Sequence, residues 1–187
     1  MTLKRIAAAF AAAIVGFSAT ANAQPADFVD LGNIGAAGNF VFDTTGSTNI
    51  TNGGNLDTEI GLFDSTGILL DNDDDGLGFP FSVIDIDLTP GEYFIAISEF
   101  DSIFADGFSV TGTQFEAGES GEAVLNINGL LAASLVIGDA ATTGLLEVAF
   151  FRFEIGDADV IPLPAAFPLF LAGLAGLRIA GRKKKTA

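Results

Sequence analysis

The chain has 187 residues, of which 24 are acidic and 8 basic, and its formal net charge is −16 at pH 7. It contains no Cys and no His, which excludes thiol nucleophiles, Cys- or His-ligated metals and imidazole-based catalytic triads. Strong acidity argues against nucleic acid as a partner, because phosphates require Lys and Arg. All 24 acids lie between Asp27 and Asp159, where Arg152 is the sole cation, and the other seven cations lie near the two ends. This layout is typical of an exported protein with a targeting segment at each end.

The first targeting segment covers residues 1–23. Lys4 and Arg5 precede an uncharged, mostly apolar run over residues 6–17, which is too short to span a bilayer. Ala21-Asn22-Ala23 then supplies a small-x-small cleavage pattern. These parts predict a helical secretory signal peptide cleaved between Ala23 and Gln24. The alternative is an uncleaved anchor or a buried helix.

Residues 24–156 are predicted to form one all-β domain, a single β-sandwich. Glycine-containing turns recur every eight to twelve residues, with short runs of Val, Ile, Leu, Phe and Thr between them. Within residues 83–88, 92–98 and 146–155, apolar side chains alternate along the run and so share one face of a strand. We expect most of the 14 Phe residues of this body to fill the core rather than bind a ligand.

Two stretches of the body, residues 56–74 and 88–97, resemble the bacterial pre-peptidase C-terminal domain. The first contains the D-x-x-G turn Asp64-Ser65-Thr66-Gly67 and the second the L-x-P-G-x-Y string from Leu88 to Tyr93. The resemblance covers about residues 39–100 and implies a jelly-roll-like sandwich. Members of the family bind calcium or polymeric ligands and usually accompany a separate catalytic domain, which this sequence lacks.

An acidic run in the body fits a calcium-loop pattern. Asp71, Asp73 and Asp75, followed by Gly76, match D-x-D-x-D-G, in which alternate carboxylates converge on one cation. An EF-hand is excluded, because the twelfth position is Ser82 instead of Glu. We therefore predict a calcium loop between strands, completed by backbone oxygens or remote acids such as Asp57 and Asp64. The alternative is a solvated acidic turn.

Residues 157–187 are predicted to form a short linker followed by the second targeting segment. Residues 160–177 are uncharged, prolines crowd their start, and a basic cluster closes the segment at residues 182–185. Proline disfavours a helix before about residue 165, so the first residues should be extended. The rest predicts a membrane helix with a cytoplasmic C-terminus.

The same segment closely resembles the PEP-CTERM family of sorting signals, in the variant named for its V-P-L-P-A box. The matching residues are Val160, Pro162, Leu163 and Pro164, with Ile161 inserted in the box. The resemblance implies recognition by an exosortase, a membrane enzyme of Gram-negative bacteria that make exopolysaccharide. It also implies cleavage near the box and delivery to the cell surface or extracellular matrix. The alternative is an ordinary tail anchor.

These observations predict a non-enzymatic surface or matrix protein, with an exosortase as partner and calcium as its one cofactor. Its precursor is expected to be anchored in the inner membrane by the C-terminal helix. The first alternative is a module that binds extracellular polysaccharide, which should expose Tyr93, Phe94 or other Phe side chains on a concave β face. The second is an acidic hydrolase, which should place two carboxylates in a cleft and raise one of their pKa values.

Overall fold

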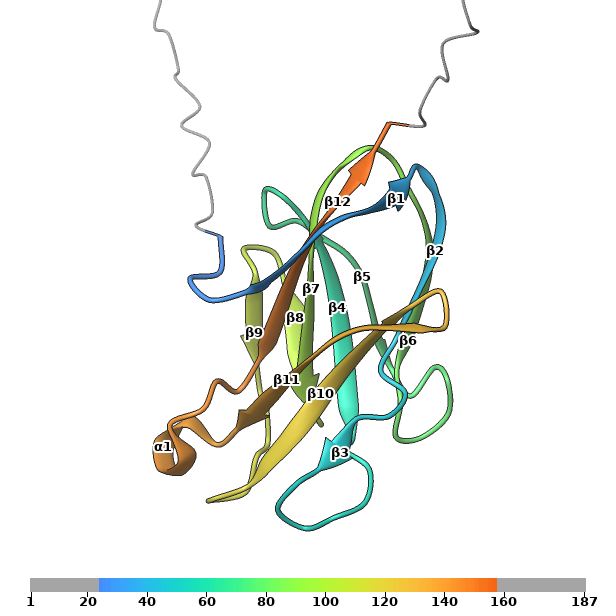
Figure 1. The fold of residues 1–187 in the computed structure, drawn as a ribbon. Helices are drawn as coiled ribbons and strands as arrows, with labels where there is room; N and C mark the ends of the chain where they lie inside the picture. Colours follow the sequence, from blue (N-terminus) through green and yellow to red (C-terminus); the bar gives the residue numbers. More distant parts are fainter. Residues whose placement is uncertain (1–23, 158–187) are drawn as a thin grey trace, which may run out of the picture.

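The computed structural model describes residues 24–157, which form a β-sandwich with two packed sheets (Figure 1). The predicted all-β class is therefore confirmed for this part of the chain. The elements are β1 (Val29–Ala36), β2 (Gly38–Asp43), β3 (Thr48–Asn49), β4 (Thr58–Asp64), β5 (Leu69–Asp74), β6 (Val83–Leu88), β7 (Gly91–Glu99), β8 (Ile103–Ala105), β9 (Ser109–Thr111), β10 (Ser120–Ile127), β11 (Leu130–Gly138), α1 (Ala140–Thr143) and β12 (Ala149–Gly156).

One sheet has the strand order β1-β12-β7-β4-β5 and the other the order β11-β10-β2-β6, with β3 also paired to β10. All pairings are antiparallel except that of β1 with β12. β8 and β9 form a separate two-stranded hairpin. The four sheet edges are therefore β1, β5, β11 and β6.

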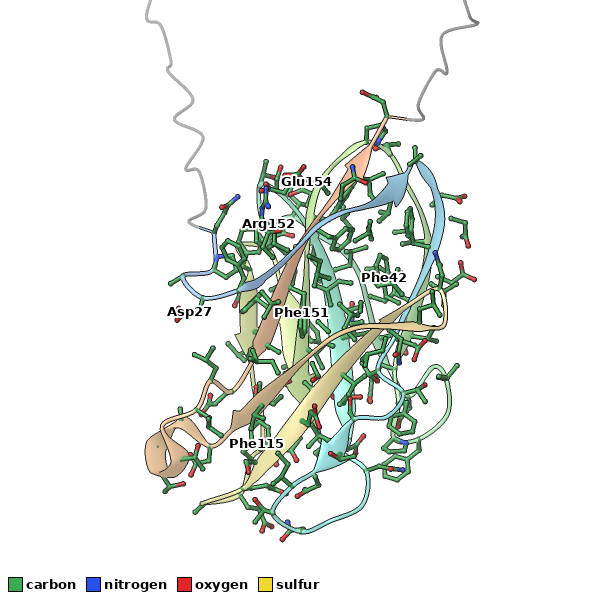
Figure 2. All side chains as sticks on the ribbon, in the orientation of Figure 1. Asp27, Phe42, Phe115, Phe151, Arg152 and Glu154 are labelled. Atoms are coloured by element: carbon green, nitrogen blue, oxygen red, sulfur yellow. The ribbon has the colours of Figure 1, made fainter. Side chains whose placement is uncertain are left out.

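The main core lies between the two sheets. Phe42 of β2 packs against Phe153 of β12 with ring centroids 5.3 Å apart, and Phe153 also stacks on Tyr93 of β7 at 5.7 Å. Phe42 and Phe153 are fully buried, as is Phe151 (Figure 2). Aromatic contacts thus join the facing sheets at the centre of the domain.

A second, smaller core covers the outer face of β4 and β7. Phe63 and Phe94 point to this face and pack against Phe104 and Phe108 of the β8–β9 hairpin region. Gly61 allows the close approach, because a Cβ on it would lie 2.5 Å from the Phe104 ring. β7 is consequently buried on both faces.

The predicted alternation is confirmed in each of the three runs. The apolar side chains predicted to share a face all contact the main core: residues 84, 86 and 88 in β6, residues 93, 95 and 97 in β7, and residues 151, 153 and 155 in β12. The expectation that Phe fills the core also holds for eight buried Phe residues of the described part. Phe79 and Phe100 are clear exceptions, being exposed in loops.

Arg152 links three strands at one face of the sandwich. Its guanidinium lies 2.9 Å from Asp30 of β1, 2.5 Å from Glu92 of β7 and 2.6 Å from Glu154 of β12 (Figure 2). The carboxylates hold the pKa of Arg152 above its ordinary value. The one cation of the acidic body therefore neutralises repulsion where β1, β7 and β12 run together.

The two predicted targeting segments fall largely outside the described residues. The signal peptide with Ala23, and the sorting residues Val160, Pro162, Leu163 and Pro164, lie there. Within residues 24–157, no helix is long and apolar enough to cross a membrane. Gln24 is described, and its side-chain amide donates a hydrogen bond to Glu92.

Candidate metal centre

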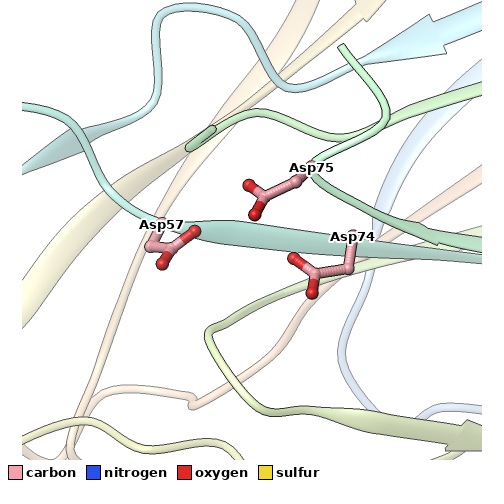
Figure 3. Close-up of side chains that lie close together, drawn as sticks. All are labelled: Asp57, Asp74 and Asp75. Carbon is pink, nitrogen blue, oxygen red and sulfur yellow. The ribbon is translucent and has the colours of Figure 1, made fainter. Parts of the chain in front are cut away.

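Three aspartates converge at one end of the sandwich. Asp57 lies just before β4, Asp74 is the last residue of β5, and Asp75 follows it (Figure 3). One carboxylate oxygen from each lies within 4.8 Å of the others. Oxygens bound to one calcium ion at 2.3–2.6 Å lie at most about 5 Å apart, so the three side chains can reach a common ion.

Backbone hydrogen bonds between neighbouring loops fix this arrangement. The N–H of Phe100 donates to the carbonyl of Asp57 at 3.1 Å, and the N–H of Gly78 donates to the carbonyl of Asp75 at 2.7 Å. Asp75 adopts a left-handed backbone conformation with φ of 61°. Asp tolerates this conformation better than most residues, and the turn directs its side chain toward Asp57.

The structure brings together a different set of acids from the predicted one. Asp75 of the predicted loop joins Asp57, one of the proposed remote acids, but the third member is Asp74. Asp73 instead accepts hydrogen bonds from the backbone N–H groups of Gly76 and Val83, each at 2.8 Å. Asp71 accepts one from the N–H of Asn72 at 2.9 Å.

The remaining predicted ligand, Asp64, caps the turn between β4 and β5. Its carboxylate accepts hydrogen bonds from the backbone N–H groups of Thr66 and Ile68. These bonds, together with one from the Thr66 hydroxyl, lower the pKa of Asp64 despite partial burial. Asp64 is therefore part of a turn and not of the acidic cluster.

The acidic cluster has carboxylate oxygens that nothing in the described chain neutralises. Oδ1 of Asp57 and Oδ1 of Asp75 are buried and accept no hydrogen bond within residues 24–157. Desolvation, followed by the negative charges of Asp75 and Asp74, raises the pKa of Asp57 to about 6. Desolvation and neighbouring acids also raise the pKa of Asp74.

Two buried glutamates extend this acidic end into the protein. Glu59 is 5% exposed and accepts a hydrogen bond from the N–H of Asp101 at 2.8 Å. Burial and the charge of Asp74 raise its pKa to about 7. Glu99 is 7% exposed, and its Oε2 has no hydrogen-bond partner in the described chain. Burial, together with the charges of Glu119, Asp57 and Glu116, raises its pKa to about 8.

The chemistry of this donor set fits a hard divalent cation. Calcium prefers carboxylate and carbonyl oxygens and tolerates irregular geometry. A buried, unpaired carboxylate costs free energy unless a cation or a proton compensates it. The Asp57–Asp74–Asp75 cluster supplies three negatively charged ligands where no basic side chain of the described chain forms an ion pair.

The glutamates with the most strongly raised pKa values do not line a substrate cavity. The better-formed cavity, of about 320 Å³, is mostly apolar and includes Leu145, Leu146, Val148 and Phe150 in its walls. A second hollow lies beside Asn33 and Asp157. Glu59 and Glu99 border neither. A raised pKa at these two positions therefore reflects burial inside the protein and not exposure to a substrate.

The aromatic residues expected for a sugar-binding β face are in the core. Tyr93 packs in the main core and Phe94 in the second core, both buried. Exposed aromatic rings lie instead beside the acidic cluster: Phe79 is 76% exposed and Phe100 48% exposed. The backbone fixes both neighbourhoods, because Phe100 is bonded to Asp57, and the carbonyl of Pro80 accepts the N–H of Thr58 at 3.1 Å.

Comparisons with known proteins find no match: no family model, no curated protein and no solved structure matches the chain. The candidate metal centre therefore stands on the geometry and electrostatics of the described residues.

Proposed function

We propose that this chain is an exported, non-enzymatic protein of the cell surface or exopolysaccharide matrix. Its body is a jelly-roll-like sandwich that calcium stabilises at the Asp57–Asp74–Asp75 cluster. An exosortase-type membrane enzyme processes the C-terminal signal containing Val160, Pro162, Leu163 and Pro164. The resemblances to pre-peptidase C-terminal domains and PEP-CTERM signals, together with the sandwich fold, support this assignment.

The observation that carries the structural role is the uncompensated acidic cluster. Three carboxylates meet where two of their oxygens are buried without a hydrogen-bond partner. In an enzyme we would expect such groups to face a cavity that admits substrate, but here the neighbouring glutamates are enclosed. A resident cation that ties Asp57 to the β5–β6 loop explains the cluster without a reaction.

Calcium should raise the melting temperature of the protein by a few degrees at millimolar concentration. An ion that binds only the folded state stabilises it by about 2.7 kcal/mol at a hundredfold excess over Kd. Extracellular calcium modules have Kd values on the order of 10⁻⁴–10⁻³ M, so the gain at millimolar calcium should be smaller. Thermal unfolding with calcium, and with sodium chloride at matched ionic strength, separates site binding from general screening.

Matched variants identify the ligands. Asp57→Asn and Asp75→Asn should abolish the calcium-specific stabilisation, and Asn also tolerates the left-handed conformation at position 75. Asp71→Asn removes the same charge from β5 outside the cluster and should retain the effect. Equal shifts with calcium and sodium in the unmodified protein would contradict the metal assignment. Loss of the shift in Asp71→Asn alone would favour the ligand set predicted from sequence.

The sorting role is tested at the proline box. Replacement of Pro162, Leu163 and Pro164 by Ala should leave a larger, membrane-retained precursor, since a protease binds extended backbone more readily than helix. The measurement is immunoblotting of membrane, surface and medium fractions in a host that carries an exosortase. Processing that is identical in the two proteins would contradict this part of the proposal.

A second candidate function is calcium-dependent binding of extracellular polysaccharide. The specific observation in its favour is that Phe79 and Phe100 present exposed rings beside the acidic cluster. Sugar faces stack on such rings, and a calcium ion can accept sugar hydroxyl oxygens in addition to protein ligands. This site would lie at the loops, whereas the sequence had suggested a β face.

One binding assay separates the two candidates. Sedimentation of the purified chain with the host exopolysaccharide, with and without calcium, measures retention by the polymer. Retention that requires calcium and disappears in Phe79→Ala and Phe100→Ala would favour the binding module. Stabilisation by calcium without retention would favour the structural role.

A further inference from the structure

β11 is an edge strand with a free side. β10 occupies one side of it, and β11 is the last strand of its sheet (Figure 1). On the other side, the N–H of Gly138 donates to the carbonyl of Leu146 at 2.9 Å. No other backbone hydrogen bond reaches β11 from outside its own sheet within residues 24–157.

The Gly138 bond shows which backbone groups face outward. Alternate residues of a strand direct their N–H and C=O groups to the same side. Since Gly138 bonds away from β10, Val136 and Ser134 must also present theirs to the free side. A register shift lies near Ala132, opposite Leu125 and Asn126. The stretch from Ser134 to Val136 is therefore a regular, unpaired template for another strand.

The side chains of β11 differ from those of the other edge strands. β5 carries three Asp residues, β6 carries two, and β1 carries Asp30 and two register shifts. β11 reads LLAASLVIG, without a charge or a proline, and Leu130 and Leu131 are 74% and 70% exposed. Charges, prolines and bulges are the usual protection of an edge against pairing. β11 has one bulge and no other protection in its nine residues.

The charge pattern identifies the strand that can occupy this edge. A partner that carries basic residues would be attracted to the acidic edges, where β11 offers no counter-charge. Two copies of this chain repel each other everywhere else on their acidic bodies, and a neutral strand is where they can approach. Antiparallel pairing of a strand with itself satisfies both sets of outward N–H and C=O groups and closes the assembly at two copies.

We propose that β11 is a dimerisation edge at which two copies of this chain pair antiparallel about a two-fold axis at Ser134. The two four-stranded sheets then form one continuous sheet. Val136 of one copy lies opposite Ala132 of the other, and the exposed leucines at the start of each β11 lie near the end of the partner's strand. This assembly adds a defined neighbour contact to a surface protein and does not depend on the metal centre.

The cysteine-free sequence gives a direct test in the full chain. Residues that face each other in a hydrogen-bonded antiparallel pair have Cα atoms about 5.5 Å apart, a separation that a disulfide accommodates. Ser134→Cys should therefore form a disulfide-linked dimer in most molecules under mild oxidation on a non-reducing gel. Asp87→Cys, exposed on the opposite edge of the same sheet, should remain monomeric, although it removes a repulsive charge.

A second pair of variants tests the interface without a covalent bond. Val136→Lys places a charge on the pairing edge and should convert the full chain in nonionic detergent from dimer to monomer by sedimentation velocity. Ile68→Lys makes the same change in charge at an exposed turn and should leave the dimer intact. The proposal is overturned if Ser134→Cys cross-links no more than Asp87→Cys. It is also overturned if the unmodified chain is monomeric or the Val136→Lys chain remains dimeric.

Discussion

The calcium-free protein should become more stable when the pH falls from 8 to about 5, which is the reverse of ordinary acid denaturation. The pKa values of Asp57, Glu59 and Glu99 are raised in the folded state to about 6, 7 and 8. Unfolded Asp and Glu titrate near pH 4. Between these values the folded state binds more protons than the unfolded state, so stability declines as the pH rises.

The effect should reach several kcal/mol, since each pKa unit corresponds to about 1.4 kcal/mol. The chain has no His, so no imidazole titrates in the same window. Below about pH 4 the trend should reverse, because hydrogen bonds or Arg152 lower the pKa values of Asp30, Asp64 and Asp139. The folded forms of these three acids lose stability as they become protonated.

Urea unfolding at a series of pH values, with a chelator present, measures this profile. Glu99→Gln should raise stability at pH 8 and flatten the upper part of the curve, because it replaces a buried carboxyl that has an unpartnered oxygen. Glu122→Gln serves as the matched control, because Glu122 is less enclosed on β10 and should change the profile little. Saturating calcium should also flatten the curve, since a bound cation favours the ionised carboxylates. Stability that is constant or rises between pH 5 and 8 without calcium would contradict the burial of these groups.

The sandwich was predictable because its signal is local. Alternation of apolar and polar residues in β6, and the punctuation by turns, depend only on neighbours along the chain. Covering of both faces of β7 follows from the uninterrupted apolar run around Phe94. What local pattern does not contain is the covering element itself, the β8–β9 hairpin, which reaches β4 only because Gly61 leaves room for Phe104.

The metal centre was only half predictable, for a reason that lies in strand register. The run from Asp71 to Asp75 was interpreted as a loop because Asp is rare in strands, but β5 continues through Asp74. Ile60 faces Asp73 and Glu59 faces Asp74 across the β4–β5 pair, so consecutive acids point to opposite faces. Asp73 then binds backbone N–H groups, while Asp74 joins Asp57. Such pairing depends on long-range contacts that spacing within one segment does not specify.

The largest single-residue loss of stability should come from Phe153→Ala. Phe153 is fully buried and contacts Phe42 of the opposite sheet and Tyr93 of its own. Truncation removes the ring and leaves a cavity between the sheets, at a cost of about 3–5 kcal/mol. That is a large part of the roughly 5–15 kcal/mol that stabilises a typical domain.

Phe79→Ala makes the same truncation at a ring that is mostly exposed, and surface substitutions usually change stability by less than about 0.5 kcal/mol. Urea unfolding of both variants in calcium should give similar slopes and a much lower midpoint for Phe153→Ala alone. The contrast is specific to position, because the two variants lose the same atoms. If both midpoints fell equally, Phe153 would not join the two sheets, and the aromatic contacts among Phe42, Tyr93 and Phe153 would not be the centre of the core.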